Sequence, residues 1–180
     1  VASRDELLAE MNGAAAKQMA ITLKGVFDAM DNETVAPSAG LLVREHTVVS
    51  QPDGNHINIR FVRPETQEQL PCVYYIHGGG MQVMSCYDGH YRAWARVIAA
   101  QGVAVAMVDF RNALTPSSVP EVAPFPAGLN DCISGLKWMH ANSAMLNIDT
   151  SRIVVAGESG GGNLTLATGL KLKRDGELRL

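Results

Sequence analysis

The residues best suited to do chemistry lie in one glycine-rich run, Gly157-Glu158-Ser159-Gly160-Gly161-Gly162. An apolar segment predicted as a buried strand (residues 153–156) precedes the run, and a predicted helix (residues 160–174) overlaps its end. A Gly-x-Ser-x-Gly sequence between strand and helix is typical of a tight turn that strains the serine and lifts its hydroxyl above the sheet. Side chains two residues to either side would clash there, so glycine is required. The pattern predicts that Ser159 is a nucleophile at the positive end of the helix.

A second glycine run lies about 80 residues upstream. His77-Gly78-Gly79-Gly80 follows residues 72–76, which are also predicted as a buried strand. Attack on an acyl carbonyl builds negative charge on its oxygen, and losing one backbone N–H aimed at that oxygen typically costs about 3–4 kcal/mol. Consecutive glycines offer such N–H groups without obstructing side chains. We therefore predict that Gly78 and Gly79, together with Gly160 after the serine, donate to this oxyanion.

The same glycines do not match nucleotide-binding loops. Residues 157–162 have the glycine spacing of a phosphate-binding loop, but Asn163-Leu164 stands where that loop requires Lys followed by Ser or Thr. Ser159 interrupts the Gly-x-Gly-x-x-Gly spacing of a dinucleotide site. The two glycine motifs together therefore favour acyl transfer over phosphate binding, more strongly than Gly-x-Ser-x-Gly alone would.

The rest of the pattern predicts an α/β fold that positions these loops. Short apolar segments separated by helical ones are typical of parallel strands covered on both faces. The turn Pro52-Asp53-Gly54 predicts an antiparallel hairpin before them. Ser3-x-x-Glu6 predicts a helix that starts near Arg4. We predict strands over residues 43–50, 56–63, 72–76, 103–108 and 153–156, helices over 21–30, 90–100, 128–142 and 160–174, and an irregular proline-rich loop over 116–126.

Length and composition indicate one ordinary globular domain. The chain has 180 residues, 47% hydrophobic and 18% charged, with a net charge of −3, so binding to nucleic acid or to an anionic membrane is not expected. No apolar run reaches the roughly 20 residues of a membrane span, and residues 1–20 lack the pattern of a signal peptide. The three cysteines have no disulfide spacing, so we expect reduced, buried thiols and a cytoplasmic location. They are Cys72, Cys86 and Cys132.

Four motifs together resemble the hormone-sensitive-lipase-like esterases, also called bacterial family IV, of the α/β-hydrolase fold. The motifs are His77-Gly78-Gly79-Gly80, Val108-Asp109-Phe110-Arg111-Asn112-Ala113, Phe125-Pro126-Ala127 followed by Asp131 and Trp138, and Gly157-Glu158-Ser159-Gly160-Gly161-Gly162-Asn163. The second and fourth are most similar to the brefeldin A esterase branch. Family members commonly carry Asp and Ala where this chain has Glu158 and Gly160, and Gly160 retains the N–H group.

The resemblance implies a carboxylic-ester hydrolase that forms an acyl-enzyme on Ser159, needs no cofactor or metal, and acts on small-molecule esters. It implies cap helices over residues 1–40 and the N-terminal part of the α/β-hydrolase core over residues 41–180. It also implies that a triad acid and histidine follow the serine, whereas the sequence stops 21 residues later at Leu180. We therefore expect the C-terminal strands, the acid and the histidine on a missing C-terminal part or a second polypeptide, and this chain alone to be nearly inactive.

Residues within the chain are less suited to those two roles. His77 belongs to the second glycine motif, where a structural hydrogen bond is expected. Asp109 and Asp131 are expected to orient loops, with Arg111 as a partner, and Glu158 to brace the serine turn. Two alternatives stay open: a non-catalytic protein of this fold that binds a small ligand, and an inactive truncated product. The remaining histidines are interpreted as surface or satisfied polar residues: His46, His56, His90 and His140.

Overall fold

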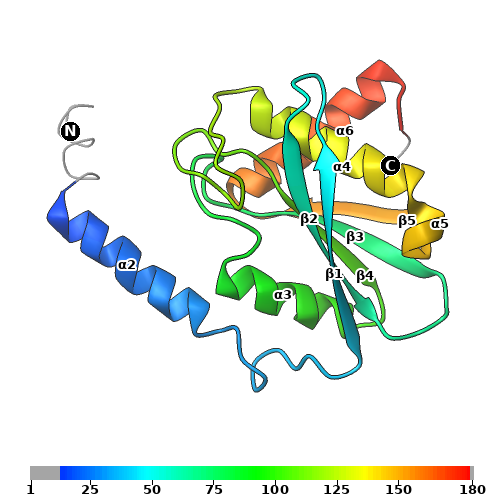
Figure 1. The fold of residues 1–180 in the computed structure, drawn as a ribbon, viewed down its shortest axis with the longest axis horizontal. Helices are drawn as coiled ribbons and strands as arrows, with labels where there is room; N and C mark the ends of the chain where they lie inside the picture. Colours follow the sequence, from blue (N-terminus) through cyan, green and yellow to red (C-terminus); the bar gives the residue numbers. More distant parts are fainter. Residues whose placement is uncertain (1–12, 179–180) are drawn as a thin grey trace.

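A computed structural model describes residues 13–178, in which helices flank a five-stranded sheet (Figure 1). Every strand and helix predicted between residues 21 and 174 is present. The strand predicted over 153–156 begins at residue 148, and the helix predicted over 21–30 belongs to a longer helix that begins at residue 14. The strands are β1 (Leu41–Val49), β2 (His56–Pro64), β3 (Leu70–Ile76), β4 (Ala104–Asp109) and β5 (Ile148–Gly157). The helices are α2 (Ala14–Asp28), α3 (Gly89–Ala99), α4 (Ala127–Ala141), α5 (Ser143–Leu146) and α6 (Gly160–Asp175).

The sheet has the strand order β1-β2-β4-β3-β5. β1 and β2 form the predicted antiparallel hairpin, and β2 also pairs antiparallel with β4. β3 lies between β4 and β5 and is parallel to both, as predicted from the apolar segments. Among residues 13–178 no strand pairs with the outer edge of β5, where Val154 is 59% exposed.

Apolar cores fill both faces of the sheet, as the near-continuous apolar strands predict. On one face, Tyr74 and Phe61 pack with Leu136 and Met139 of α4 and with Leu164 of α6. The opposite face packs against α3, whose Tyr91, Ala95 and Ala99 meet Val105 and Met107 of β4. Every residue of β4 is buried, which is the expected result for a central strand covered on both sides.

Helix α2 lies outside these cores. It joins the end of the helix predicted from Arg4 to the helix predicted from residue 21, and its alanine-rich start has high helix propensity. None of its residues is buried. It extends away from the sheet in Figure 1 and contacts the core at its C-terminal end. There the Phe27 ring lies 4.6 Å from the His90 ring, and Asp28 accepts a hydrogen bond from the N–H of Gly89. The start of the helix predicted from Arg4 lies outside the described residues.

A buried ion pair holds the segment after β4. Arg111 donates from its backbone N–H and its guanidinium to Asp131 of α4, at 2.9–3.0 Å, which confirms the expected pairing. Ser50 at the end of β1 also donates to Asp131, at 2.6 Å. Asp109 does not pair with Arg111. Its carboxylate accepts instead from Ser85 Oγ and from the N–H groups of Cys86 and Ser118.

The described helices and cysteines agree with the sequence. No helix within residues 13–178 combines the length and apolar character that crossing a membrane requires. Cys72, Cys86 and Cys132 are free and buried. Burial raises the pKa of Cys72 to about 12, so this thiol stays protonated at neutral pH and is a poor nucleophile.

Candidate active site

Ser159 occupies the sharp turn between β5 and α6. Its backbone has φ 52° and ψ −121°, a conformation that non-glycine residues rarely adopt and that is retained where the surrounding structure enforces it. Ser159 is the N-cap residue of α6, and its side chain is exposed. Its Oγ has no hydrogen bond to any residue in the described part of the chain. The predicted strand–turn–helix context of this serine is therefore confirmed.

The two glycines that flank Ser159 at a distance of two residues are required by the packing of the turn. A Cβ at Gly157 would lie 2.6 Å from the carbonyl oxygens of Gly161 and Ile76. A Cβ at Gly161 would lie 2.1 Å from Ile76 O and 2.6 Å from His77 O. All these neighbours are backbone atoms, which cannot rotate away. The clash predicted from the spacing is thus present on both sides of the serine.

Replacing Gly161 by alanine should destabilise the protein, because its Cβ overlaps the end of β3. We expect the free energy of unfolding to fall by about 3 kcal/mol. Gly169 in the same helix is the matched control, since no atom lies within 4 Å of its added Cβ. Gly169→Ala should stabilise by about 0.5–1 kcal/mol through better helix propensity. Chemical denaturation measures both changes, and equal effects at the two positions would contradict the steric argument.

The second glycine run lies directly against the serine turn. A Cβ at Gly160 would approach the N and Cα of Gly80 to 2.8 Å, so the two backbones meet where Gly160 lacks a side chain. Gly79 and Gly80 have φ of 92° and 63°, which glycine adopts without strain. Within residues 13–178, the N–H groups of Gly79, Gly80 and Gly160 donate to no protein atom. Three unengaged donors therefore lie in the two glycine runs beside Ser159.

Gly78 departs from its predicted role as an oxyanion donor. Its N–H donates to Glu158 Oε1 and to Tyr91 Oη, both at 2.8 Å. A donor engaged by a carboxylate and a hydroxyl is not available to a reacting carbonyl. Gly80, which the sequence pattern did not single out, has the free N–H group instead, next to Gly160.

His77 has a structural place in the second glycine run, as expected. It is fully buried, stacks on Phe110 with ring centroids 4.2 Å apart, and its Nδ1 lies 2.9 Å from the carbonyl oxygen of Gly78. Because a carbonyl only accepts, Nδ1 carries the proton. Burial lowers the pKa of His77, so the ring is neutral at physiological pH and holds the loop as a neutral donor.

No histidine in the described part of the chain hydrogen-bonds to Ser159. His46 packs against Trp138, with ring centroids 5.0 Å apart, and His90 packs between Phe27 and Tyr91. His56 begins β2 and His140 lies in the last turn of α4. The acidic candidates Asp109, Asp131 and Glu158 are all engaged by other donors. Residues 13–178 also contain no group of three side chains suited to hold a metal ion.

Two cavities flank the serine and glycine loops. One of about 490 Å³ lies between α2 and the segment after the glycine run, with Leu23, Phe27, Val83 and Met84 among its lining residues. A second of about 380 Å³ is bordered by Gly80 and Met81 on one side and by Leu164 on the other. Both have apolar walls, and the second is bordered by Gly80, whose N–H group is free.

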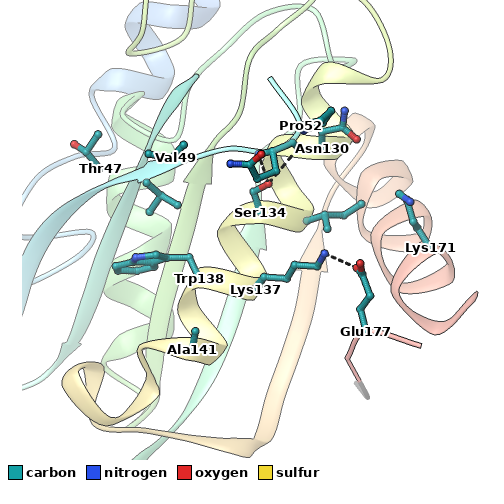
Figure 2. Close-up of a pocket in the computed structure, with 13 residues that line it drawn as sticks. Thr47, Val49, Pro52, Asn130, Ser134, Lys137, Trp138, Ala141, Lys171 and Glu177 are labelled. Atoms are coloured by element: carbon teal, nitrogen blue, oxygen red, sulfur yellow. Dashed lines mark hydrogen bonds and ion pairs between the residues drawn. The ribbon is translucent and has the colours of Figure 1, made fainter. Parts of the chain in front are cut away.

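A larger cavity, of about 860 Å³, lies elsewhere. Figure 2 shows it between β1 and helix α4, with Trp138 and Thr47 at one end and the ion pair of Lys137 and Glu177 at the other. None of the predicted site residues lines it. Size alone therefore does not mark the reactive site of this protein.

Comparison with known proteins shows that the chain is similar to esterases. A family model described as alpha/beta hydrolase fold matches residues 73–180. The chain is 40% identical over 112 residues to carboxylesterase NlhH of Mycobacterium tuberculosis. The aligned region covers 62% of this chain and 32% of that protein. Esterase Est22, whose structure is solved, is 58% identical in sequence and superposes with a TM-score of 0.88. The match covers 98% of this chain and 52% of the Est22 chain. Brefeldin A esterase, described as a bacterial homologue of human hormone-sensitive lipase, is 34% identical with a TM-score of 0.77 over 99% and 47%.

This chain spans about a third of the length of the carboxylesterase and about half of the two esterases of known structure. The family match begins in β3 and includes the glycine run, the serine turn and helix α6. The likeness to Est22 extends over almost every residue of the chain. The chain thus belongs to the alpha/beta hydrolase fold family, within its hormone-sensitive-lipase-like esterases.

Proposed function

We propose that this chain carries the nucleophile and the oxyanion donors of a serine carboxylesterase. The observation that carries the proposal is the strained, exposed Ser159 beside the unengaged N–H groups of Gly79, Gly80 and Gly160. Ser159 Oγ attacks the ester carbonyl, and the three N–H groups stabilise the oxyanion of the tetrahedral intermediate. The alcohol then leaves, and water hydrolyses the acyl-enzyme. Gly78 has no part in this version of the oxyanion hole.

The base and the acid of the triad come from residues outside this sequence. This part of the proposal is supported by Ser159 Oγ, which has no histidine partner among residues 13–178, and by relatives that are about twice as long. The missing residues lie either on a continuation of the polypeptide or on a second chain. In a serine hydrolase, loss of the base costs about 10⁶-fold in turnover, so these 180 residues alone are nearly inactive.

The substrate is a small ester whose apolar part lies in the cavity beside α2. Leu23 and Phe27 of α2 line that cavity together with Val83 and Met84, so α2 acts as part of a cap over the site. One structure of Est22 was solved with p-nitrophenol, which is the alcohol released from p-nitrophenyl esters. Such an ester is therefore a suitable reporter substrate for this chain as well.

The test joins residues 1–180 to a C-terminal part, taken from the polypeptide's own coding sequence or from Est22; this protein is called the completed enzyme below. The completed enzyme should hydrolyse p-nitrophenyl acetate about 10⁶-fold faster than residues 1–180 alone. A folded completed enzyme without hydrolysis would contradict the esterase proposal. Equal rates would show that the base lies within residues 1–180. Intact mass analysis of the natural protein then distinguishes one polypeptide from two.

A further inference from the structure

The carboxylate of Glu158, the residue before the nucleophile, gathers three hydrogen-bond donors. Its Oε1 accepts from the N–H of Gly78 at 2.8 Å and from the hydroxyl of Tyr91. Its Oε2 accepts from the hydroxyl of Tyr75 at 2.6 Å. The donors come from the end of β3, the glycine run and helix α3. One side chain thus links the serine turn to three separate parts of the fold.

The two tyrosines hold the carboxylate in place. Tyr91 is 3% exposed and Tyr75 is 9% exposed. Burial, followed by the hydrogen bond to Glu158, raises the pKa of both phenols well above the usual value. Both hydroxyls therefore stay protonated and donate at neutral pH. Tyr91 Oη also accepts from the N–H of Gly78, so the tyrosine, the glycine and the carboxylate form a closed three-membered network.

The absence of a side chain at Gly78 is an independent sign of this contact. A Cβ at Gly78 would lie 2.5 Å from Glu158 Oε1 and 3.1 Å from Tyr91 Oη. Gly78 has no positive φ, so its backbone conformation alone does not require glycine. A side chain there would instead displace the Glu158 carboxylate from its contact with Gly78. The first glycine of the run is therefore explained by Glu158, whereas Gly79 and Gly80 have positive φ.

We infer that Glu158 is a positioning residue: it anchors Gly78 so that the next two N–H groups, those of Gly79 and Gly80, face the oxyanion. The inference rests on the proposed function of Ser159. Glu158 acts through the glycine run and touches no substrate. Its carboxylate hydrogen-bonds to no histidine in the described residues, so it has no contact typical of a triad acid. Since a displacement of about 1 Å costs on the order of 10²-fold in rate, losing the anchor has a large effect on the chemical step.

Four variants of the completed enzyme test the inference. Glu158→Ala should lower kcat for p-nitrophenyl acetate by about 10²-fold and leave KM within about threefold. The affinity for a trifluoromethyl ketone, which forms a tetrahedral adduct, should fall by the same factor as kcat/KM. Glu158→Gln should recover most of the activity, because its amide oxygen accepts from Gly78 and Tyr91 while its amide nitrogen donates to Tyr75 Oη.

The tyrosines are a matched pair within the same experiment. Tyr91→Phe removes a group bound to both Gly78 and Glu158, so it should lower kcat by about 10-fold with a parallel loss of ketone affinity. Tyr75→Phe removes only the partner of Oε2 and should have a smaller effect. If Glu158→Ala does not fold, the kcat values and ketone affinities of Tyr91→Phe, Tyr75→Phe and Glu158→Gln test the inference instead.

A purely structural role would give a different result. In that case Glu158→Ala would lower the midpoint temperature of thermal unfolding. At temperatures well below this midpoint, its kcat and its ketone affinity would match those of the parent. That result would show that the inference is wrong. Equal kinetics for Tyr91→Phe and the parent would also contradict it. A parent enzyme that lacks esterase activity would instead refute the proposed function, so the two failures are distinguishable.

Discussion

Replacing Ser159 by alanine in the completed enzyme is expected to lower ester turnover by about 10⁶-fold. The residual rate should still exceed the rate in water by about 10³–10⁴-fold, because the oxyanion donors and the binding cavities remain. Removal of the Oγ leaves no group to form the acyl-enzyme, and no described neighbour can replace it. A fluorophosphonate probe should label the parent on one serine and should not label Ser159→Ala.

A nearby serine provides the control for this experiment. Ser151 is exposed in β5 and its Oγ donates to Asp149, so Ser151→Ala should retain both turnover and labelling. Labelling that persists in Ser159→Ala would place the nucleophile on another residue. If a folded parent is not labelled, the non-catalytic alternative for this fold is favoured.

Replacing Asp131 by alanine should cost about 3–5 kcal/mol of unfolding free energy. Asp131 is fully buried, and Arg111 is 7% exposed. The carboxylate accepts from the backbone N–H, Nε and a terminal nitrogen of Arg111, and from Ser50. Without it, a buried guanidinium loses its main counter-charge, and the hydroxyl of Ser50 loses its acceptor. The loss is measured by chemical denaturation of the variant beside the parent.

Asp53 is the matched control, because it pairs with the same guanidinium from the surface. It lies 2.7 Å from a terminal nitrogen of Arg111, and its side chain is 45% exposed. Solvent screens this pair, so Asp53→Ala should cost at most about 1 kcal/mol. Equal losses for the two aspartates would show that burial does not set the strength of the Arg111 interactions.

Local patterns were sufficient for the fold and for the strained turn at Ser159. Apolar runs of strand length, glycines two residues on either side of Ser159, and turn residues between β1 and β2 all act over a few neighbouring positions. The glycine spacing around Ser159 can be recognised locally, although the Cβ distances at Gly157 and Gly161 show that the end of β3 also excludes side chains there. The pattern predicts two helical segments, one from Arg4 and one over residues 21–30, whereas residues 14–28 form one continuous helix.

The assignment of individual donors could not be predicted in this way. Gly78, Gly79 and Gly80 are chemically identical in the sequence, so nothing local distinguishes the N–H that is engaged from those that are free. That distinction depends on a carboxylate 80 residues later and on a hydroxyl in α3. The sequence by itself determined an α/β hydrolase with a strained serine between β5 and α6, because those features follow from neighbouring residues. Only the tertiary structure decided that Glu158 takes the N–H of Gly78 and leaves Gly79, Gly80 and Gly160 unengaged, because these partners meet only when β3, α3 and β5 pack together.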